Sequence, residues 1–141
     1  MSIITAQSAA AQYAVTLPHT RRAPSTARRI SERWLKATAP VDRLNEAVLI
    51  VSELVTNAVR HTSDSCTLTL TVGDGRLDIA VADHSEELPD LFRCSGDERG
   101  GFGMGIIREL GGRIRSVPAI GGKTVHVLLE LQSAPGTFEG G

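Results

Sequence analysis

The chain has little cysteine and no long apolar segment. Its two cysteines, Cys66 and Cys94, lie 28 residues apart without a CxxC motif or a histidine at ligand spacing, which excludes a disulfide framework and a zinc site. No apolar run approaches the roughly 20 residues that cross a bilayer, and the N-terminus lacks the basic residues and apolar core of a signal peptide. These absences predict a cytoplasmic protein with no membrane partner.

An excess of charge of either sign is also missing. The 141 residues carry a formal net charge of -1, and 41% of them are hydrophobic and 22% charged. The length fits one domain that can bury a real core, and the balanced charge gives no support for a nucleic-acid partner. Arginines gather early, in RRAPSTARRISER at residues 21–33, which is either a solvated helix face or a contact surface for an acidic partner.

Apolar periodicity predicts two long helices in the first half of the chain. Apolar residues recur at helical intervals over 25–38 and form a continuous stripe over 44–58. Helical geometry places the centre of the second stripe near Leu44, Val48 and Val51. This stripe is the strongest candidate for the core-facing surface of a helix.

Alternation of apolar and polar residues predicts five strands. Gly-Asp-Gly between two alternating runs is a strong hairpin signal, and a short helix is expected over 104–110. Hairpins with grouped helices predict an α+β fold, a two-layer sandwich of a mainly antiparallel mixed sheet covered on one face by helices, and not a doubly wound parallel sheet. The expected strands are residues 13–17, 66–72, 76–83, 112–117 and 123–131.

One folded domain is expected over residues 13–131. A flexible N-terminus at 1–12, rich in Ala, Ser and Gln, would precede it, and a flexible tail at 132–141 would follow. The segment 84–101 mixes charge, Pro and Gly without a usable period. A segment of this length inside a compact domain indicates a functional loop or lid.

The most informative motif is SELVTNAVRHT at residues 52–62. Glu53, Asn57 and His61 recur at intervals of four, so on a helix they form one column away from the main apolar face. In a nucleotide site, Asn57 could supply an oxygen ligand for Mg²⁺, and Glu53 could orient or deprotonate a hydroxyl nucleophile. The alternative is a column of three solvated polar residues, and we assign no chemistry to His61.

Two glycine-rich segments and one aspartate are further candidates. GGFGMG at 100–105 opens the short helix, where free backbone N–H groups can bind an anion, although a flexible turn is an equal alternative. GGKT at 121–124 imitates the end of a Walker A motif, but Val117 stands where its first glycine is required. Asp83 follows a strand in VADHS and could accept a hydrogen bond from an exocyclic amine or serve as a turn residue.

Together, these motifs resemble those of the GHKL ATP-binding fold. SELVTNAVRH resembles the N-box, VADHS a shortened first glycine box, and ERGGFGMGIIREL at 98–110 the lid and second glycine box. The superfamily includes the ATPase domains of histidine kinases and gyrase. Short domains with ELVTNAVRH and ERxGxGM are most similar to the bacterial anti-sigma-factor serine/threonine kinases, and the resemblance covers about residues 13–131.

The resemblance implies ATP and Mg²⁺ as cofactors. Asn57 would bind the magnesium ion, and Glu53 would be the general base that acts on the substrate serine. Asp83 would receive the adenine amino group, and Thr124 in GGKTV would support that contact. The implied partners are an anti-anti-sigma protein, a sigma factor and, as a homodimer, a second copy of the chain.

The resemblance also assigns the phosphate contacts. Gly101 and Gly103 would bring backbone N–H groups to the phosphates, and Arg99 would lie near the terminal phosphate, where its charge would stabilise phosphoryl transfer. One departure concerns the first glycine box, usually Asp-x-Gly-x-Gly, in which Ser85 and Glu87 replace both glycines. The alternative hypothesis is therefore a binding module of the same fold that regulates a partner without phosphoryl transfer.

Overall fold

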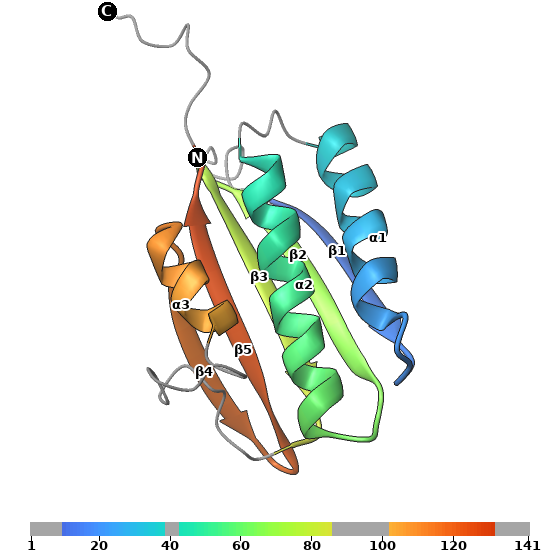
Figure 1. Cartoon of the computed structure of the whole chain (residues 1–141). Coiled ribbons are helices and arrows are strands. Elements are labelled where there is room, and N and C mark those ends of the chain that lie inside the picture. Colours follow the sequence, from blue (N-terminus) through green and yellow to red (C-terminus); the bar gives the residue numbers. More distant parts are fainter. Residues whose placement is uncertain (1–9, 39–42, 86–101, 132–141) are drawn as a thin grey trace, which may run out of the picture.

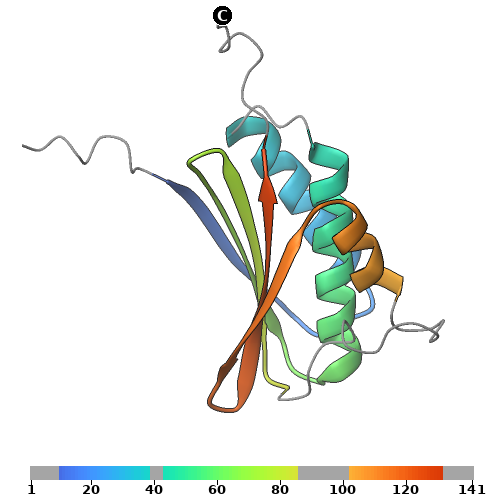
Figure 2. The same cartoon turned by 90° about the vertical axis from the view of Figure 1, so that its left-hand side faces the viewer.

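The computed structural model describes residues 10–38, 43–85 and 102–131. Five strands form one sheet in the order β1-β2-β3-β5-β4, and every pairing among the described strands is antiparallel. Three helices cover one face of this sheet (Figures 1 and 2). The elements are β1 (Ala11–Leu17), α1 (Ala23–Thr38), α2 (Leu44–His61), β2 (Cys66–Gly73), β3 (Arg76–Asp83), α3 (Phe102–Glu109), β4 (Arg113–Ala119) and β5 (Gly122–Glu130).

The two-layer α+β fold predicted from the sequence is confirmed, with small differences at the ends of elements. β1 begins at Ala11, so the strand includes the last residues of the segment expected to be flexible. β4 continues through Pro118 to Ala119, which is possible because β4 is an edge strand that needs no further hydrogen-bond donor there. The other flexible residues expected at both ends, and most of the expected lid, lie outside the described residues.

Tight hairpins hold the strands in register. Asp74 and Gly75 connect β2 to β3 with φ angles of 53° and 74°, and two consecutive residues with positive φ match the twist of paired strands. β4 turns into β5 through Ile120 and Gly121, where Gly121 has a φ of 76°. Turn chemistry visible in the sequence therefore accounts for both hairpins.

The core lies between the helices and the inner face of the sheet. Alternate residues of each central strand point toward the helices, and each fully buried Leu, Ile or Val contributes about 1.5–3 kcal/mol. α2 crosses the middle of this face (Figure 1) and buries one side completely. The inward residues of β2, β3 and β5 in the core are Cys66, Leu68, Leu70, Leu77, Ile79, Val81, Val125, Val127 and Leu129.

The buried side of α2 is rotated relative to the prediction. Leu44 and Val48 are only partly buried, whereas Ala47, Leu54 and Ala58 are almost fully buried. The reason is that α1 packs along one flank of α2 while the sheet lies beneath it, as their many contacts indicate. The apolar stripe of one helix does not show on which flank a second helix packs against it.

α1 packs against the edge of the sheet that β1 forms. It buries Ala27, Ser31 and Leu35 at intervals of four, with Ala27 and Leu35 fully inaccessible to solvent. The rings of Tyr13 on β1 and Trp34 on α1 stack with centroids 5.9 Å apart and an interplanar angle of 24°, a favourable offset geometry. None of the helices described, within residues 10–38, 43–85 and 102–131, is long and apolar enough to cross a membrane.

Arg43 joins three elements at one end of the sandwich. It occupies the N-cap position of α2, and its Nε donates to Glu46 Oε1 at 2.8 Å. Nη1 donates to the carbonyl oxygen of Glu130 at 2.9 Å, and Nη2 donates to the carbonyl oxygen of Leu110 just after α3. One guanidinium therefore connects the start of α2 to carbonyls at the end of β5 and just after α3.

We expect Arg43→Ala to lower the free energy of unfolding by about 2 kcal/mol, because the hydrogen bonds of a charged donor are lost, two of them partly buried. Chemical denaturation measures the change. Arg29→Ala, at an exposed position of α1, is the matched control and should change stability by less than about 0.5 kcal/mol. Equal effects of the two substitutions would contradict the role given to Arg43.

Candidate functional site

The polar column on α2 forms as the sequence predicts. Glu53, Asn57 and His61 lie one turn apart, and all three are partly buried. They flank the buried side of α2, since Leu54 and Ala58 beside them in the sequence are in the core. Partial burial argues against three freely solvated residues and places the column at the border between core and solvent.

Burial changes the acidity of Glu53. Loss of water contact raises the pKa of the Glu53 carboxyl above its ordinary value of 4.5, and the positive charge of Arg60 opposes part of that rise. A carboxylate with a raised pKa is a better proton acceptor than an exposed one. Glu53 therefore has the chemistry of a general base, with the amide of Asn57 one turn away.

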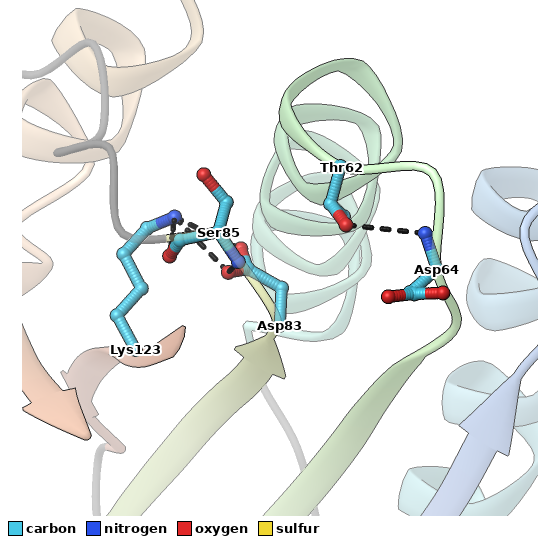
Figure 3. Close-up of polar contacts among 5 residues, drawn as sticks. All are labelled: Thr62, Asp64, Asp83, Ser85 and Lys123. Carbon is cyan, nitrogen blue, oxygen red and sulfur yellow. Dashed lines mark hydrogen bonds and ion pairs between the residues drawn. The ribbon is translucent and has the colours of Figure 1, made fainter. Parts of the chain in front are cut away.

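The second half of the site lies where β3 ends. Asp83 pairs with Lys123 across the β3–β5 ladder, and Lys123 Nζ lies 3.1 Å from Asp83 Oδ1 and 3.0 Å from Asp83 Oδ2. Only 5% of the Lys123 side chain and 4% of the Asp83 side chain are exposed. Figure 3 shows both side chains turned toward each other beside the end of α2.

This ion pair satisfies its own hydrogen-bonding groups. Besides the two carboxylate oxygens, Lys123 Nζ donates to the carbonyl oxygen of Ser85 at 3.3 Å, so the three N–H bonds of the ammonium have three acceptors. The backbone N–H of Ser85 donates to Asp83 Oδ1 at 2.9 Å. A buried ion pair is tolerated only when its remaining groups are bonded in this way.

The backbone around the pair is closely packed. A Cβ atom added to Gly122 would lie 2.1 Å from the carbonyl oxygen of Asp83, so only glycine fits at the start of β5. Cys66 at the start of β2 is also buried, and burial, with a further contribution from the charge of Asp83, raises the pKa of its thiol to about 11. The surroundings of Asp83 on the inner face are therefore largely dry.

The structure does not bring Thr124 to Asp83. Thr124 pairs with Ala82, and since successive residues of a strand face opposite sides, its side chain points to the face without helices. Lys123 lies at Asp83 instead. Sequence reasoning missed Lys123, although alternation counted back from the apolar Val125 would have placed it on the inner face.

Some of the remaining predicted residues lie within the described part of the chain and others lie outside it. Gly103 lies in the first turn of α3, whereas Arg99, Gly101 and Glu87 lie outside the described residues. Ser85 stands where the first glycine box usually has glycine, is buried, and contributes its backbone to the ion pair. Beyond the end of α2, Thr62 Oγ1 accepts a hydrogen bond of 3.1 Å from the backbone N–H of Asp64 (Figure 3), which orders the turn into β2.

The described residues combine an antiparallel sheet covered by helices with a carboxylate–amide column on α2. A family profile described as a histidine kinase-like ATPase domain matches residues 17–128. The chain therefore belongs to the histidine kinase-like ATPase domain family. A search of curated proteins found no match.

A solved structure of a histidine kinase shares the fold. The Acinetobacter baumannii histidine kinase AdeS is similar with a TM-score of 0.55 and 15% identity, over 86% of this chain and 68% of that chain. A histidine kinase domain from the Erythrobacter litoralis EL346 blue-light activated histidine kinase has a TM-score of 0.48 and 22% identity, over 81% of this chain and 65% of that chain. At such identities the likeness to AdeS shows the fold alone.

The raised pKa of Glu53 predicts a pH-dependent stability difference. The folded state binds the Glu53 proton more tightly than the unfolded chain, so stability falls as pH rises from 4.5 through the folded pKa. Glu53→Gln removes this loss. We therefore expect the variant to have a higher melting temperature than the wild type at neutral pH and the same melting temperature below pH 4.5.

Glu32→Gln is the matched control, because Glu32 lies on the exposed side of α1 in a surface ion pair with Lys36. Such a pair contributes about 0–1 kcal/mol, so this substitution should not raise the melting temperature at neutral pH. A Glu53→Gln protein that is equally stable as, or less stable than, wild type at neutral pH would contradict the burial argument.

Proposed function

We propose that the chain is an ATP-binding regulatory protein, an anti-sigma-factor serine/threonine kinase that phosphorylates an anti-anti-sigma partner and sequesters a sigma factor. The observation that carries the proposal is the pair of Glu53 and Asn57, one turn apart on α2, in a chain of the histidine kinase-like ATPase family. The raised pKa of Glu53 suits a base that accepts the proton of a substrate hydroxyl.

The described residues fit a magnesium–nucleotide complex at α2. They include no group of three or more His, Cys, Asp and Glu side chains that could hold a metal ion by themselves. Magnesium in nucleotide sites is held by one or two protein oxygens, phosphates and water, so the Asn57 amide is a sufficient protein ligand. Bound ATP would supply the phosphoryl group, and Glu53 would orient and deprotonate the acceptor hydroxyl.

The proposal also assigns the residues that would contact the phosphates of the nucleotide. Gly101 and Gly103 would donate backbone N–H groups to the phosphates, and Arg99 would place positive charge at the terminal phosphate. The proposed setting is the cytoplasm, with an anti-anti-sigma protein, a sigma factor and a second copy of the chain as partners, and no direct contact with nucleic acid or membrane.

A second candidate function follows from the other half of the site. Asp83 is already bonded to Lys123, and Ser85 and Glu87 replace the two glycines usual in the first glycine box. These features favour a binding module that holds a partner protein without phosphoryl transfer. The two candidates share the fold and differ in whether the chain transfers a phosphoryl group to its partner.

Calorimetric titration with ATP and Mg²⁺ tests the nucleotide site first. We expect micromolar binding to the wild type, about -8 kcal/mol, and at least about tenfold weaker binding to Asn57→Ala, because the metal loses its protein ligand. Asn45→Ala is the control, since Asn45 is exposed on the same helix and should bind ATP as the wild type does. Chelation of Mg²⁺ should remove the difference between the variants.

Transfer of labelled phosphate to an anti-anti-sigma protein then separates the two candidates. Glu53→Gln should slow transfer by about 10²–10⁴-fold, the usual contribution of a general base, while ATP still binds. ATP binding without transfer to any cognate antagonist would exclude the kinase and leave the binding module. Absence of ATP binding by a folded wild-type protein would also exclude the kinase and leave the binding module, which needs no nucleotide.

A further inference from the structure

We propose that Lys123 occupies the position at Asp83 that a nucleobase amino group would take, so that the chain does not select its nucleotide by that amino group. The proposal rests on the proposed function, because it concerns the same nucleotide site. It assigns a role in specificity to a residue that the sequence motifs did not single out. Recognition would depend on the phosphates and the metal, near Asn57.

The first step concerns the donors that Asp83 can accept. An ammonium and an exocyclic amine are both N–H donors, and each needs an acceptor oxygen about 2.7–3.2 Å away. Lys123 Nζ already lies within this distance of both carboxylate oxygens. Oδ1 also accepts the backbone N–H of Ser85, so three of the about four acceptor positions of the carboxylate are already taken.

The second step concerns access. The two side chains of the ion pair are about 95% removed from solvent, and the carboxylate faces the inner side of the sheet beside Val81 and Val125. A base that reached Asp83 would have to separate two buried charges. Such a separation leaves an uncompensated charge in a dry site and is strongly unfavourable.

The third step concerns what holds Lys123 in place. Its backbone is fixed in the β3–β5 ladder, and the preceding Gly122 is packed against the backbone of Asp83. The third N–H bond of the ammonium, to the carbonyl oxygen of Ser85, also holds the chain as it leaves β3. Lys123 is therefore held by main-chain geometry and by three acceptors together.

Inosine triphosphate is a direct probe of this arrangement, because it carries a carbonyl group where ATP carries the amino group. We expect the wild-type protein to bind ATP and inosine triphosphate, each with Mg²⁺, with affinities within about threefold. Lys123→Met keeps the unbranched shape of the side chain, is one atom shorter and leaves the carboxylate without its ammonium partner. We expect this variant to prefer ATP by at least about tenfold, which corresponds to about 1.4 kcal/mol.

Asp78→Asn is the matched control. Asp78 and His126 form a hydrogen-bonded pair between the same two strands, with His126 Nδ1 3.1 Å from Asp78 Oδ2, but on the face without helices. Loss of this pair should leave the ratio of the two affinities unchanged. A similar change in both variants would indicate a general effect on the sheet and would overturn the proposal.

Lys123→Met can fail to fold, because it leaves Asp83 buried without a partner. The double variant Asp83→Asn, Lys123→Met contains no buried charge and provides the second measurement. If the wild type prefers ATP by about tenfold or more and the double variant loses that preference, Asp83 reads the base and the proposal is wrong. If the wild type and the double variant both bind the two triphosphates with affinities within about threefold, the proposal is supported.

The result also separates this proposal from the proposed function. Binding of both triphosphates through Asn57, together with a strong wild-type preference for ATP, would overturn the role of Lys123 and leave the nucleotide site intact. Failure of the wild type and of folded Lys123→Met to bind either triphosphate would overturn the nucleotide site itself, and the role of Lys123 with it.

Discussion

The register between β3 and β5 is the constraint on which both the core and the site depend. It sets Val81 opposite Val125 on the inner face, where both pack beneath the helices. A slip of one residue would turn every side chain of a strand to the other face, so hydrophobic burial holds the register firmly. The same register ends with Asp83 opposite Lys123, and a buried ion pair follows from the packing of the core.

The site therefore has two halves with different chemistry. On α2, Glu53 and Asn57 are partly buried, and under the proposed function they would meet the metal and the acceptor hydroxyl. At the end of β3, Asp83 is enclosed and its charge is balanced by Lys123. Membership of the histidine kinase-like ATPase family is compatible with this division, because the fold depends on the sheet and helices and not on a free carboxylate at Asp83.

Much of this arrangement could be predicted from the sequence, because strands and hairpins depend on local patterns. Alternation and the Gly-Asp-Gly turn predicted the sheet, and the spacing of Glu53 and Asn57 predicted their column. Likeness to a motif indicated Thr124 as the neighbour of Asp83, whereas alternation along β5 places Lys123 on the inner face and the strand register sets it opposite Asp83. The buried side of α2 is rotated away from Val48 because α1 packs against α2. The sequence of one helix alone does not predict this contact.

Selective acylation of lysines tests the central claim most directly, because the chain has only two, Lys36 and Lys123. Lys36 has 62% of its side chain exposed and serves as the internal reference. An amine paired and buried in the folded state reacts only after local opening, so Lys123 should be modified at least about tenfold more slowly than Lys36 in the native protein and equally fast in denaturant. Equal rates in the native protein would show that Asp83 is not held by Lys123 and would contradict this account of the site.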